Sequence, residues 1–249
     1  MNHNQTNHEA GAHVLAFDFK GEHKMSAPRI LVACEYSGIV RDAFAARGWD
    51  AWSCDLLESE KPGGQHYVGD VRDLLAEDWD LMVAHPPCTF LSNSGAGHMY
   101  VGKGKEEKAR LGYTIDQERW ANMEEGAAFF NLLWTASVPR IAVENPIMHG
   151  WGVERVGGKA SQFVQPYEFG HLESKKTGFR LKNLPPLTPS NNLVKEFNDL
   201  PKSETHKVHR MSPGPERWKN RSRTFPGIAQ AMADQWGPLV ESGALEIAA

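Results

Sequence analysis

The sequence has few cysteines and no long apolar run. Both absences exclude classes of protein to which it could otherwise belong. Three cysteines in 249 residues are too few for a disulfide framework, and an odd number cannot all be paired. Their spacing is not that of zinc ligands. No run approaches the ~18 apolar residues that a membrane span needs. The N-terminus lacks a basic start followed by an apolar stretch, so we expect no secretory signal. These features predict a cytoplasmic protein with reduced thiols and no membrane contact.

Charge is distributed unevenly along the chain. The 27 Lys and Arg residues against 31 Asp and Glu residues give a net charge of −4. Residues 151–225 hold 14 basic and 7 acidic side chains, a net charge of +7, which leaves −11 for the remainder. A basic segment on an acidic body is able to bind a polyanion locally, although a solvated basic surface explains the same charges.

Apolar runs alternate with helical patterns in the first 150 residues. The runs that read as short buried strands are 30–34, 49–54, 81–84 and 141–143, and the helical patterns lie over 40–46, 71–78 and 116–136. Strands that alternate with helices predict an α/β, Rossmann-like fold, with a mostly parallel sheet and helices on both faces. After residue 150, prolines separate a predicted hairpin (164–169 and 177–181) from a terminal helix over 228–236.

Polar or reactive side chains stand at five strand ends, those of the four runs above and that of the segment 67–68. These residues are Glu35, Asp55, Asp70, Cys88 and Glu144. Ligands bind outside the carboxyl ends of the strands in open parallel sheets, so we expect a shared site at this edge.

Cys88 and Glu144 carry the chemistry that this edge predicts. Cys88 follows two prolines, which restrict its backbone, and a thiolate there is a strong nucleophile; a buried core cysteine is the alternative. Glu144 follows an apolar strand, so we expect desolvation to raise its pKa and let it share a proton near neutrality; a carboxylate cap is the alternative. Together they suit attack on an electron-poor ring that is protonated as it is attacked.

Two segments resemble signatures of DNA cytosine-5 methyltransferases. Residues 85–92 (HPPCTFLS) resemble the Pro-Cys signature of that family, and residues 142–146 (AVENP) resemble its Glu-Asn-Val signature. The chain looks like a short, divergent member of the kind found in phages and mobile elements. The resemblance implies that Cys88 adds to carbon 6 of cytosine while Glu144 supports protonation of ring nitrogen 3. Carbon 5 then takes a methyl group from S-adenosylmethionine, which leaves S-adenosylhomocysteine, and no metal is required.

The resemblance also implies a cofactor site and one further catalytic residue. Residues 32–38 stand where the family has its glycine-containing first loop, but only one of the usual glycines is present. Asp55 is implied to bind the ribose hydroxyls, and Asp70 the adenine amine. The implied cofactor-binding residues are Glu35, Tyr36, Ser37, Gly38, Asp55, Asp70, Val71 and Pro86. Lys175 stands for the first arginine of a family stretch in which Thr177 replaces the second.

The implied partner is DNA, as a duplex from which the target cytosine is flipped out. The loop 92–105 is interpreted as a lid over that base. The residues predicted to contact DNA are Ser92, Lys103, Lys105, Arg217, Trp218, Arg221 and Arg223. Amino methylation is disfavoured because His85 and Cys88 replace both defining positions of the Asp/Asn-Pro-Pro-aromatic motif.

The predicted organisation has four parts. A flexible extension (1–27) precedes a methyltransferase domain (28–181), a reduced target-recognition segment (182–224) and a C-terminal helix that returns to the domain (225–249). Two other functions stay open at this point. The short recognition segment suits a modifier of pyrimidine nucleotides or one with an altered cofactor, and the degenerate first loop suits an inactive nucleic-acid-binding relative. A restriction-modification pair, an orphan modifier and self-protection of a mobile element are equally open, as are the recognition sequence and the oligomeric state.

Overall fold

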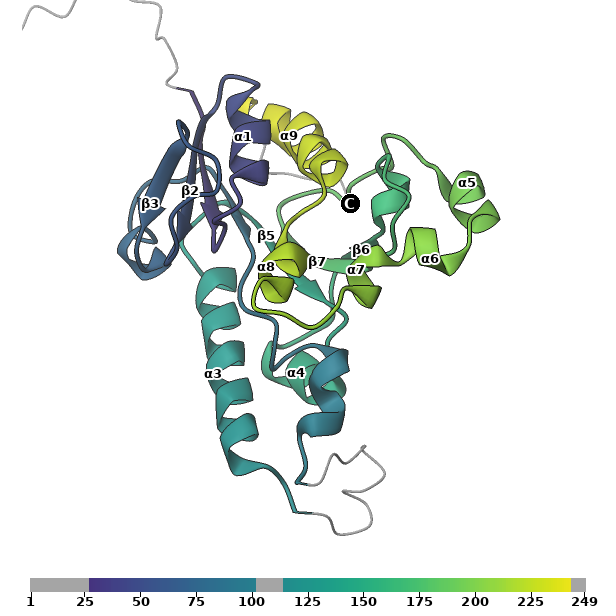
Figure 1. The fold of residues 1–249 in the computed structure, drawn as a ribbon. Helices are drawn as coiled ribbons and strands as arrows, with labels where there is room; N and C mark the ends of the chain where they lie inside the picture. Colours follow the sequence, from purple (N-terminus) through teal and green to yellow (C-terminus); the bar gives the residue numbers. More distant parts are fainter. Residues whose placement is uncertain (1–26, 102–113, 243–249) are drawn as a thin grey trace, which may run out of the picture.

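The computed structural model describes residues 27–101 and 114–242 (Figure 1). The predicted extension 1–27, apart from its last residue, and the predicted DNA contacts Lys103 and Lys105 lie outside the described residues. Within them, seven strands are present: β1 (Arg29–Ala33), β2 (Asp50–Asp55), β3 (Gln65–Val68), β4 (Leu81–Ala84), β5 (Arg140–Pro146), β6 (Gln162–Val164) and β7 (Thr177–Lys182). The α-helices are α1 (Ile39–Ala45), α3 (Gln117–Trp134), α4 (Gly150–Arg155), α5 (Val194–Asp199), α6 (Lys202–Thr205), α7 (Lys207–Arg210), α8 (Arg217–Ser222) and α9 (Pro226–Glu241). The 3-10 helices are η1 (Val71–Asp73), η2 (Asn93–His98) and η3 (Pro166–Glu168).

The strands form one sheet in the order β3-β2-β1-β4-β5-β7-β6. The pairs from β3 to β5 are parallel, and β7 runs antiparallel to both of its neighbours. Short, continuously apolar runs such as 30–33 and 81–84 form central strands because both of their faces are buried. The predicted α/β, Rossmann-like fold with a mostly parallel sheet is confirmed.

Helices cover both faces of the sheet, and successive strand residues face opposite layers. Ile30 and Val32 of β1 pack toward α1 and α9, while Leu31 packs toward α3. Figure 1 shows α1 beside α9, with α3 and α4 on the other side of the strands. Helix α9 packs closely against Trp49 at Gly237. A Cβ on Gly237 would lie 2.0 Å from the Trp49 indole, so a larger residue does not fit there. Across the described ranges, every helix is too short or too polar to cross a lipid bilayer.

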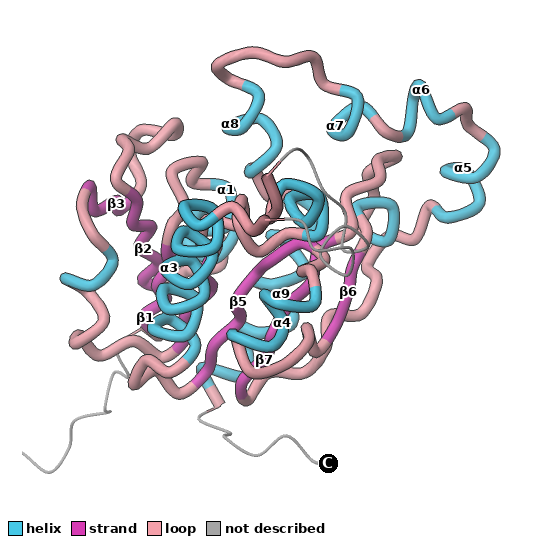
Figure 2. The backbone as a smooth tube through the Cα atoms, turned by 90° about the horizontal axis from the view of Figure 1, so that it is seen from below, coloured by secondary structure: helices cyan, strands magenta, loops and turns pink. Residues whose placement is uncertain are grey.

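Several elements differ from their predicted extent. The predicted helix over 71–78 is the 3-10 turn η1, because the indole of Trp79 donates to the carbonyl of Leu74 at 2.8 Å and folds the chain back. The first strand of the predicted hairpin, 164–169, is wrong: β6 ends at Val164 and the turn η3 follows it, whereas the second, 177–181, lies within β7. β7 pairs with β5 and β6 pairs with β7, so both strands extend the main sheet. The recognition segment predicted to begin at residue 182 starts inside the core, since Leu184 and Leu187 are buried there. Figures 1 and 2 show α5, α6 and α7 on an arm that leads away from the sheet.

Candidate functional site

The carboxyl ends of β4 and β5 bring His85 and Glu144 together. The strands are parallel neighbours in which Ala84 pairs with Val143, so the next residue of each strand is adjacent in space. Nδ1 of His85 lies 3.1 Å from Oε2 of Glu144, and the two side chains are 9% and 15% exposed. Nε2 of His85 is buried and has no hydrogen-bond partner among the described residues.

The charge of Glu144 differs from the expectation. Burial acts to raise the pKa of its carboxyl group, as predicted. The hydrogen bond to His85 and the positive charge of Lys175 outweigh burial, so the pKa is lowered and the raised pKa predicted from desolvation alone is wrong. Glu144 is therefore ionised at neutral pH, and it is able to accept a proton before it delivers one.

Cys88 follows β4 by four residues and is half-buried. Burial, followed by the negative charge of Glu144, raises the pKa of its thiol to about 11. The positive charges of Lys175 and Arg221 act in the opposite direction without reversing the shift. Cys88 is therefore a thiol at neutral pH, and its use as a nucleophile requires a proton acceptor.

Lys175 connects Cys88 and Glu144 to the C-terminal end of α8 and the residue that follows it. Its Nζ donates to the carbonyl of Arg223 at 2.9 Å and lies 3.4 Å from that of Ser222. Burial lowers the pKa of Lys175, while the negative charges of Glu144 and Cys88 act to raise it. Lys175 and Glu144 also share a small cavity with Thr177, Thr224, Phe225 and Ile228.

The chain after Cys88 is tied to the chain after β5. His149 donates from Nε2 to the carbonyl of Phe90 at 2.8 Å, and its Nδ1 accepts the amide of Gly152 at 3.0 Å. The amide of Asn93 donates to the carbonyl of Ile147 at 2.7 Å. These contacts fix the loop that carries Cys88 against the strand that carries Glu144.

Ser92, predicted to contact DNA from a lid, lies inside this braced region. Its side chain is buried, its Oγ is 2.9 Å from Oγ of Ser94, and its backbone bridges to Met148. Pro86, which was predicted to bind the cofactor, is also buried.

The polar groups of the first loop, residues 32–38, form hydrogen bonds within the loop and to the start of α1. The carboxylate of Glu35 accepts the hydroxyl of Ser37 at 2.9 Å and the amides of Val40 and Arg41 at 2.7 and 3.2 Å. It therefore caps the N-terminus of α1, where amide groups lack helical partners. Gly38 has φ +68°, and a Cβ there would lie 2.5 Å from the guanidinium of Arg41.

Cys34 is a feature of this loop that sequence reasoning missed. It has φ +58°, a left-handed conformation that is uncommon outside glycine, at the point where β1 ends. Its thiol is influenced by the charges of Asp55 and Asp70, and its pKa is raised, mainly by burial. The signal in the sequence was the missing glycine of the loop.

Asp55 and Asp70 differ in the contacts that their carboxylates make. The carboxylate of Asp55 accepts the amide of Leu57 at 3.0 Å; burial raises the pKa of its carboxyl group, while backbone hydrogen bonds from Leu57 and Leu56 act to lower it. Asp70 caps η1 through the amide of Arg72 at 2.9 Å and pairs with its guanidinium at 2.6 Å. Val71 is buried, while Leu56, beside Asp55, is 74% exposed.

These residues fit S-adenosylmethionine in part. The half-buried carboxylate of Asp55 suits ribose hydroxyls, and the exposed side chain of Leu56 offers an apolar surface for a purine ring. Glu35 and Asp70 are already engaged, so binding through their carboxylates has to compete with the contacts described above.

Helix α8 lies over the first loop. The hydroxyl of Tyr36 donates to the carbonyl of Lys219 at 2.8 Å and lies 3.1 Å from Oγ of Ser222. The ring of Tyr36 is 6.0 Å from that of Trp218, which is 55% exposed. We call residues 217–223, which close over the first loop in this way, the α8 strap.

The arginines predicted to bind DNA occupy three different settings. Arg223 forms a two-point ion pair with Glu60, at 2.8 and 2.7 Å, which raises its pKa. Nε of Arg217 donates to the carbonyl of Met211 at 2.9 Å. Arg221 is half-buried, and its charge reaches Cys88 and Lys175. Of the predicted set, Arg221 is thus the arginine whose charge acts on Cys88, and Trp218 lies against Tyr36 of the first loop.

Comparison with known proteins gives a likeness of fold. No known protein family and no curated protein matches the sequence. The chain is similar to a solved structure described as a candidate DNA modification methyltransferase encoded within a prophage (E. coli), with a TM-score of 0.38, 14% identity, and coverage of 62% of this chain and 46% of the other. It is also similar to the Entamoeba histolytica methyltransferase EhMeth, with a TM-score of 0.36, 12% identity, and coverage of 65% and 54%. The alignments thus span about half of each of these structures.

Two further observations complete the site. In the portions that the structure describes, no group of three His, Cys, Asp or Glu side chains is placed to hold a metal ion. His85 was not predicted as a functional residue, although its signal was present: it is the first residue after the buried run 81–84, directly opposite Glu144 once β4 and β5 are neighbours.

Proposed function

We propose that the protein is an enzyme that transfers a methyl group from S-adenosylmethionine to carbon 5 of cytosine in DNA, through a covalent adduct with Cys88. The observation that carries this proposal is the gathering of a cysteine, an ionised glutamate and two basic side chains around the neighbouring strands β4 and β5. Glu144 is held by His85 at 3.1 Å, and the charges of Glu144, Lys175 and Arg221 all act on Cys88.

The order of proton movements follows from the protonation states of the two residues. The sulfur of Cys88 bonds to carbon 6 of the base and releases its proton, which the ionised Glu144 accepts. Glu144 passes this proton to ring nitrogen 3, so that the electrons of the ring collect at carbon 5. Once carbon 5 is methylated, its hydrogen leaves as a proton to solvent. As the carbon–sulfur bond breaks, ring nitrogen 3 gives its proton back to Glu144, which returns it to the sulfur of Cys88, so that the thiol, the ionised carboxylate and the aromatic ring are all restored.

Lys175 and His85 have different supporting roles in this scheme. Lys175 is a cation beside both Cys88 and Glu144, and it stabilises negative charge on the sulfur as the proton leaves. His85 does not touch the base in this proposal; it is a positioning residue that fixes the carboxylate of Glu144.

Asp55 and the apolar surface at Leu56 would hold the cofactor, by way of the ribose hydroxyls and the purine ring. S-adenosylmethionine supplies an electrophilic methyl group to carbon 5 when it is bound. The α8 strap closes this side of the site through Tyr36 and Glu60. In this proposal Arg221 and Trp218 contact the DNA, because a cation neutralises phosphate and an indole stacks on a base.

The proposal is tested by the product. Duplex DNA of mixed sequence is incubated with methyl-labelled S-adenosylmethionine and the full chain, then digested to nucleosides. We expect label in 5-methylcytosine, and none with Cys88→Ala or with a Glu144→Leu variant. Label in free cytidine nucleotides, with none in DNA, would move the substrate to nucleotides. Tight cofactor binding with no transfer to either would make the chain an inactive relative.

A further inference from the structure

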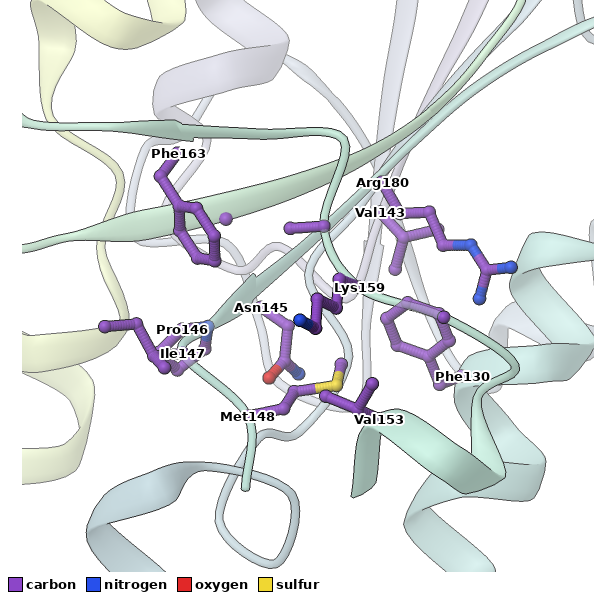
Figure 3. Close-up of a pocket in the computed structure, with 13 residues that line it drawn as sticks. Phe130, Val143, Asn145, Pro146, Ile147, Met148, Val153, Lys159, Phe163 and Arg180 are labelled. Atoms are coloured by element: carbon purple, nitrogen blue, oxygen red, sulfur yellow. The ribbon is translucent and has the colours of Figure 1, made fainter. Parts of the chain in front are cut away.

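A second pocket lies on the face of β5 opposite Glu144. Side chains alternate along the strand: Ala142 packs on the α9 side and Val143 on the α3 side, so Glu144 and Asn145 face opposite layers. Asn145 enters a cavity of about 160 Å³ (Figure 3). The cavity lies on the opposite face of the sheet from Glu144 and is therefore a separate site.

The amide of Asn145 has no partner. Its side chain is 4% exposed, and neither Oδ1 nor Nδ2 has a hydrogen bond within the described ranges. A buried amide without partners is rare because the group loses water without replacement. Asn145 therefore offers one donor and one acceptor, side by side, to whatever enters the cavity.

The rest of the pocket selects a flat ring. Its walls are mainly apolar and include the aromatic rings of Phe130 and Phe163; Phe163 is 41% exposed and marks the open rim. Gly178 lets two of the walls pack closely against β7, since a Cβ there would lie 2.9 Å from the Phe163 ring and 3.0 Å from Cβ of Ala160. A cavity of about 150 Å³ accepts a benzene-sized ring, so this volume suits a single six-membered ring better than a fused pair.

Two cationic side chains line the pocket, and they differ in whether they are already engaged by the protein. The guanidinium of Arg180 is engaged by the carbonyls of Val156 and Gly157 and lies 4.4 Å from the Trp134 ring centre. Lys159 is exposed, and Figure 3 shows its side chain beside Asn145 at the pocket. An occupant with an anionic group outside the cavity therefore meets the ammonium of Lys159.

We propose that this pocket binds the pyrimidine base of a nucleotide. The amide of Asn145 pairs with the adjacent donor and acceptor of the base edge, Phe130 and Phe163 contact the ring, and Lys159 meets the phosphate. The ligand is a free pyrimidine nucleotide or an unpaired nucleotide of DNA, which share this chemistry. The site is separate from Cys88 and Glu144, and binding there does not depend on the proposed methyl transfer.

The test is a methyl NMR titration of the full chain, without S-adenosylmethionine, with cytidine 5′-monophosphate as the probe. Ile147 and Met148 line the pocket and report on it directly. We expect saturable shifts of both methyl groups, at least tenfold weaker binding in Asn145→Leu, and weaker binding of the nucleotide but not of cytidine in Lys159→Ala. Adenosine 5′-monophosphate should bind more weakly, and Glu144→Gln should leave the shifts in place.

Controls separate the two sources and protect the test against a misfolded variant. A single-stranded oligodeoxynucleotide that shifts the same methyl groups at tenfold lower concentration than the nucleotide identifies DNA as the source; the reverse order identifies the free nucleotide. Ala160→Leu fills the cavity from a loop and should abolish the shifts as Asn145→Leu does. No shift at millimolar probe, or shifts that persist in both variants and vanish in Glu144→Gln, overturns the proposal.

Discussion

Nδ1 of His85 lies 3.1 Å from Oε2 of Glu144, at the ends of two neighbouring parallel strands. Together with Lys175, this contact keeps the Glu144 carboxyl group ionised in a place where burial alone would keep it neutral. The negative charge in turn contributes to the raised pKa of Cys88. The two groups thus begin with the proton on sulfur and the charge on oxygen, the arrangement from which a proton transfer can accompany attack.

Loss of the His85 imidazole should misplace Glu144. We expect His85→Ala to lower kcat roughly 100-fold, the cost of a displacement of about 1 Å in a catalytic group, with little change in KM for DNA. Because the hydrogen bond lowers the pKa of Glu144, its loss raises that pKa, and the acid limb of the rate profile should move to higher pH. His85→Asn, which retains a donor near the Nδ1 position, should recover most of kcat. Equal profiles for His85→Ala and the parent would remove the positioning role.

Cys88 should report the charges around it through its alkylation rate. Its pKa of about 11 predicts that iodoacetamide labelling increases tenfold per pH unit between pH 7 and 9, because only the thiolate reacts. Glu144→Gln removes a negative charge that raises this pKa, so labelling at pH 8 should become about 3-fold to 10-fold faster. Lys175→Met should have the opposite effect. Mass spectrometry of the labelled peptide gives both rates, and a slower reaction in Glu144→Gln would contradict the electrostatic account.

Much of the fold was predictable, because apolar runs such as 30–33 and 81–84 have few alternatives to a buried strand. The same pattern placed Glu144 close to the carboxyl end of β5 and Cys88 in the chain that follows β4, although β5 runs on to Pro146, where it pairs with β7. The charge of Glu144 was not predictable, since its partner His85 is 59 residues away and the neighbourhood of β4 and β5 sets the contact. The docking of the α8 strap on Tyr36 joins positions 183 residues apart, which no local pattern encodes.

The ion pair between Glu60 and Arg223 should hold the α8 strap in place. Glu60→Gln removes the charge from the pair without adding or removing a trypsin site. We expect faster cleavage after Lys219 and Arg221, by a factor of about 2 to 5, since exposed ion pairs contribute up to about 1 kcal/mol. Glu58→Gln on the same loop is the matched control and should leave the cleavage rate unchanged. Identical digestion of both variants would show that other contacts hold the strap.

The unpartnered amide of Asn145 should lower the stability of the ligand-free protein. We expect Asn145→Leu to raise the free energy of unfolding in urea by about 1 to 2 kcal/mol, because it removes a buried donor and acceptor that have no partners. The slope of the unfolding transition should not change. A loss of stability would indicate that the amide is satisfied in the folded protein and serves its packing.

The most direct test of the central claim is covalent trapping. The full chain is incubated with S-adenosylmethionine and mixed-sequence duplex DNA that contains 5-fluorocytosine, beside Cys88→Ala. Fluorine at carbon 5 blocks the final loss of a proton, so the account predicts a denaturation-resistant protein–DNA adduct whose mass maps to Cys88 and which the variant does not form. Absence of any adduct under conditions where cofactor binding is measured, or an adduct that Cys88→Ala still forms, would contradict the account.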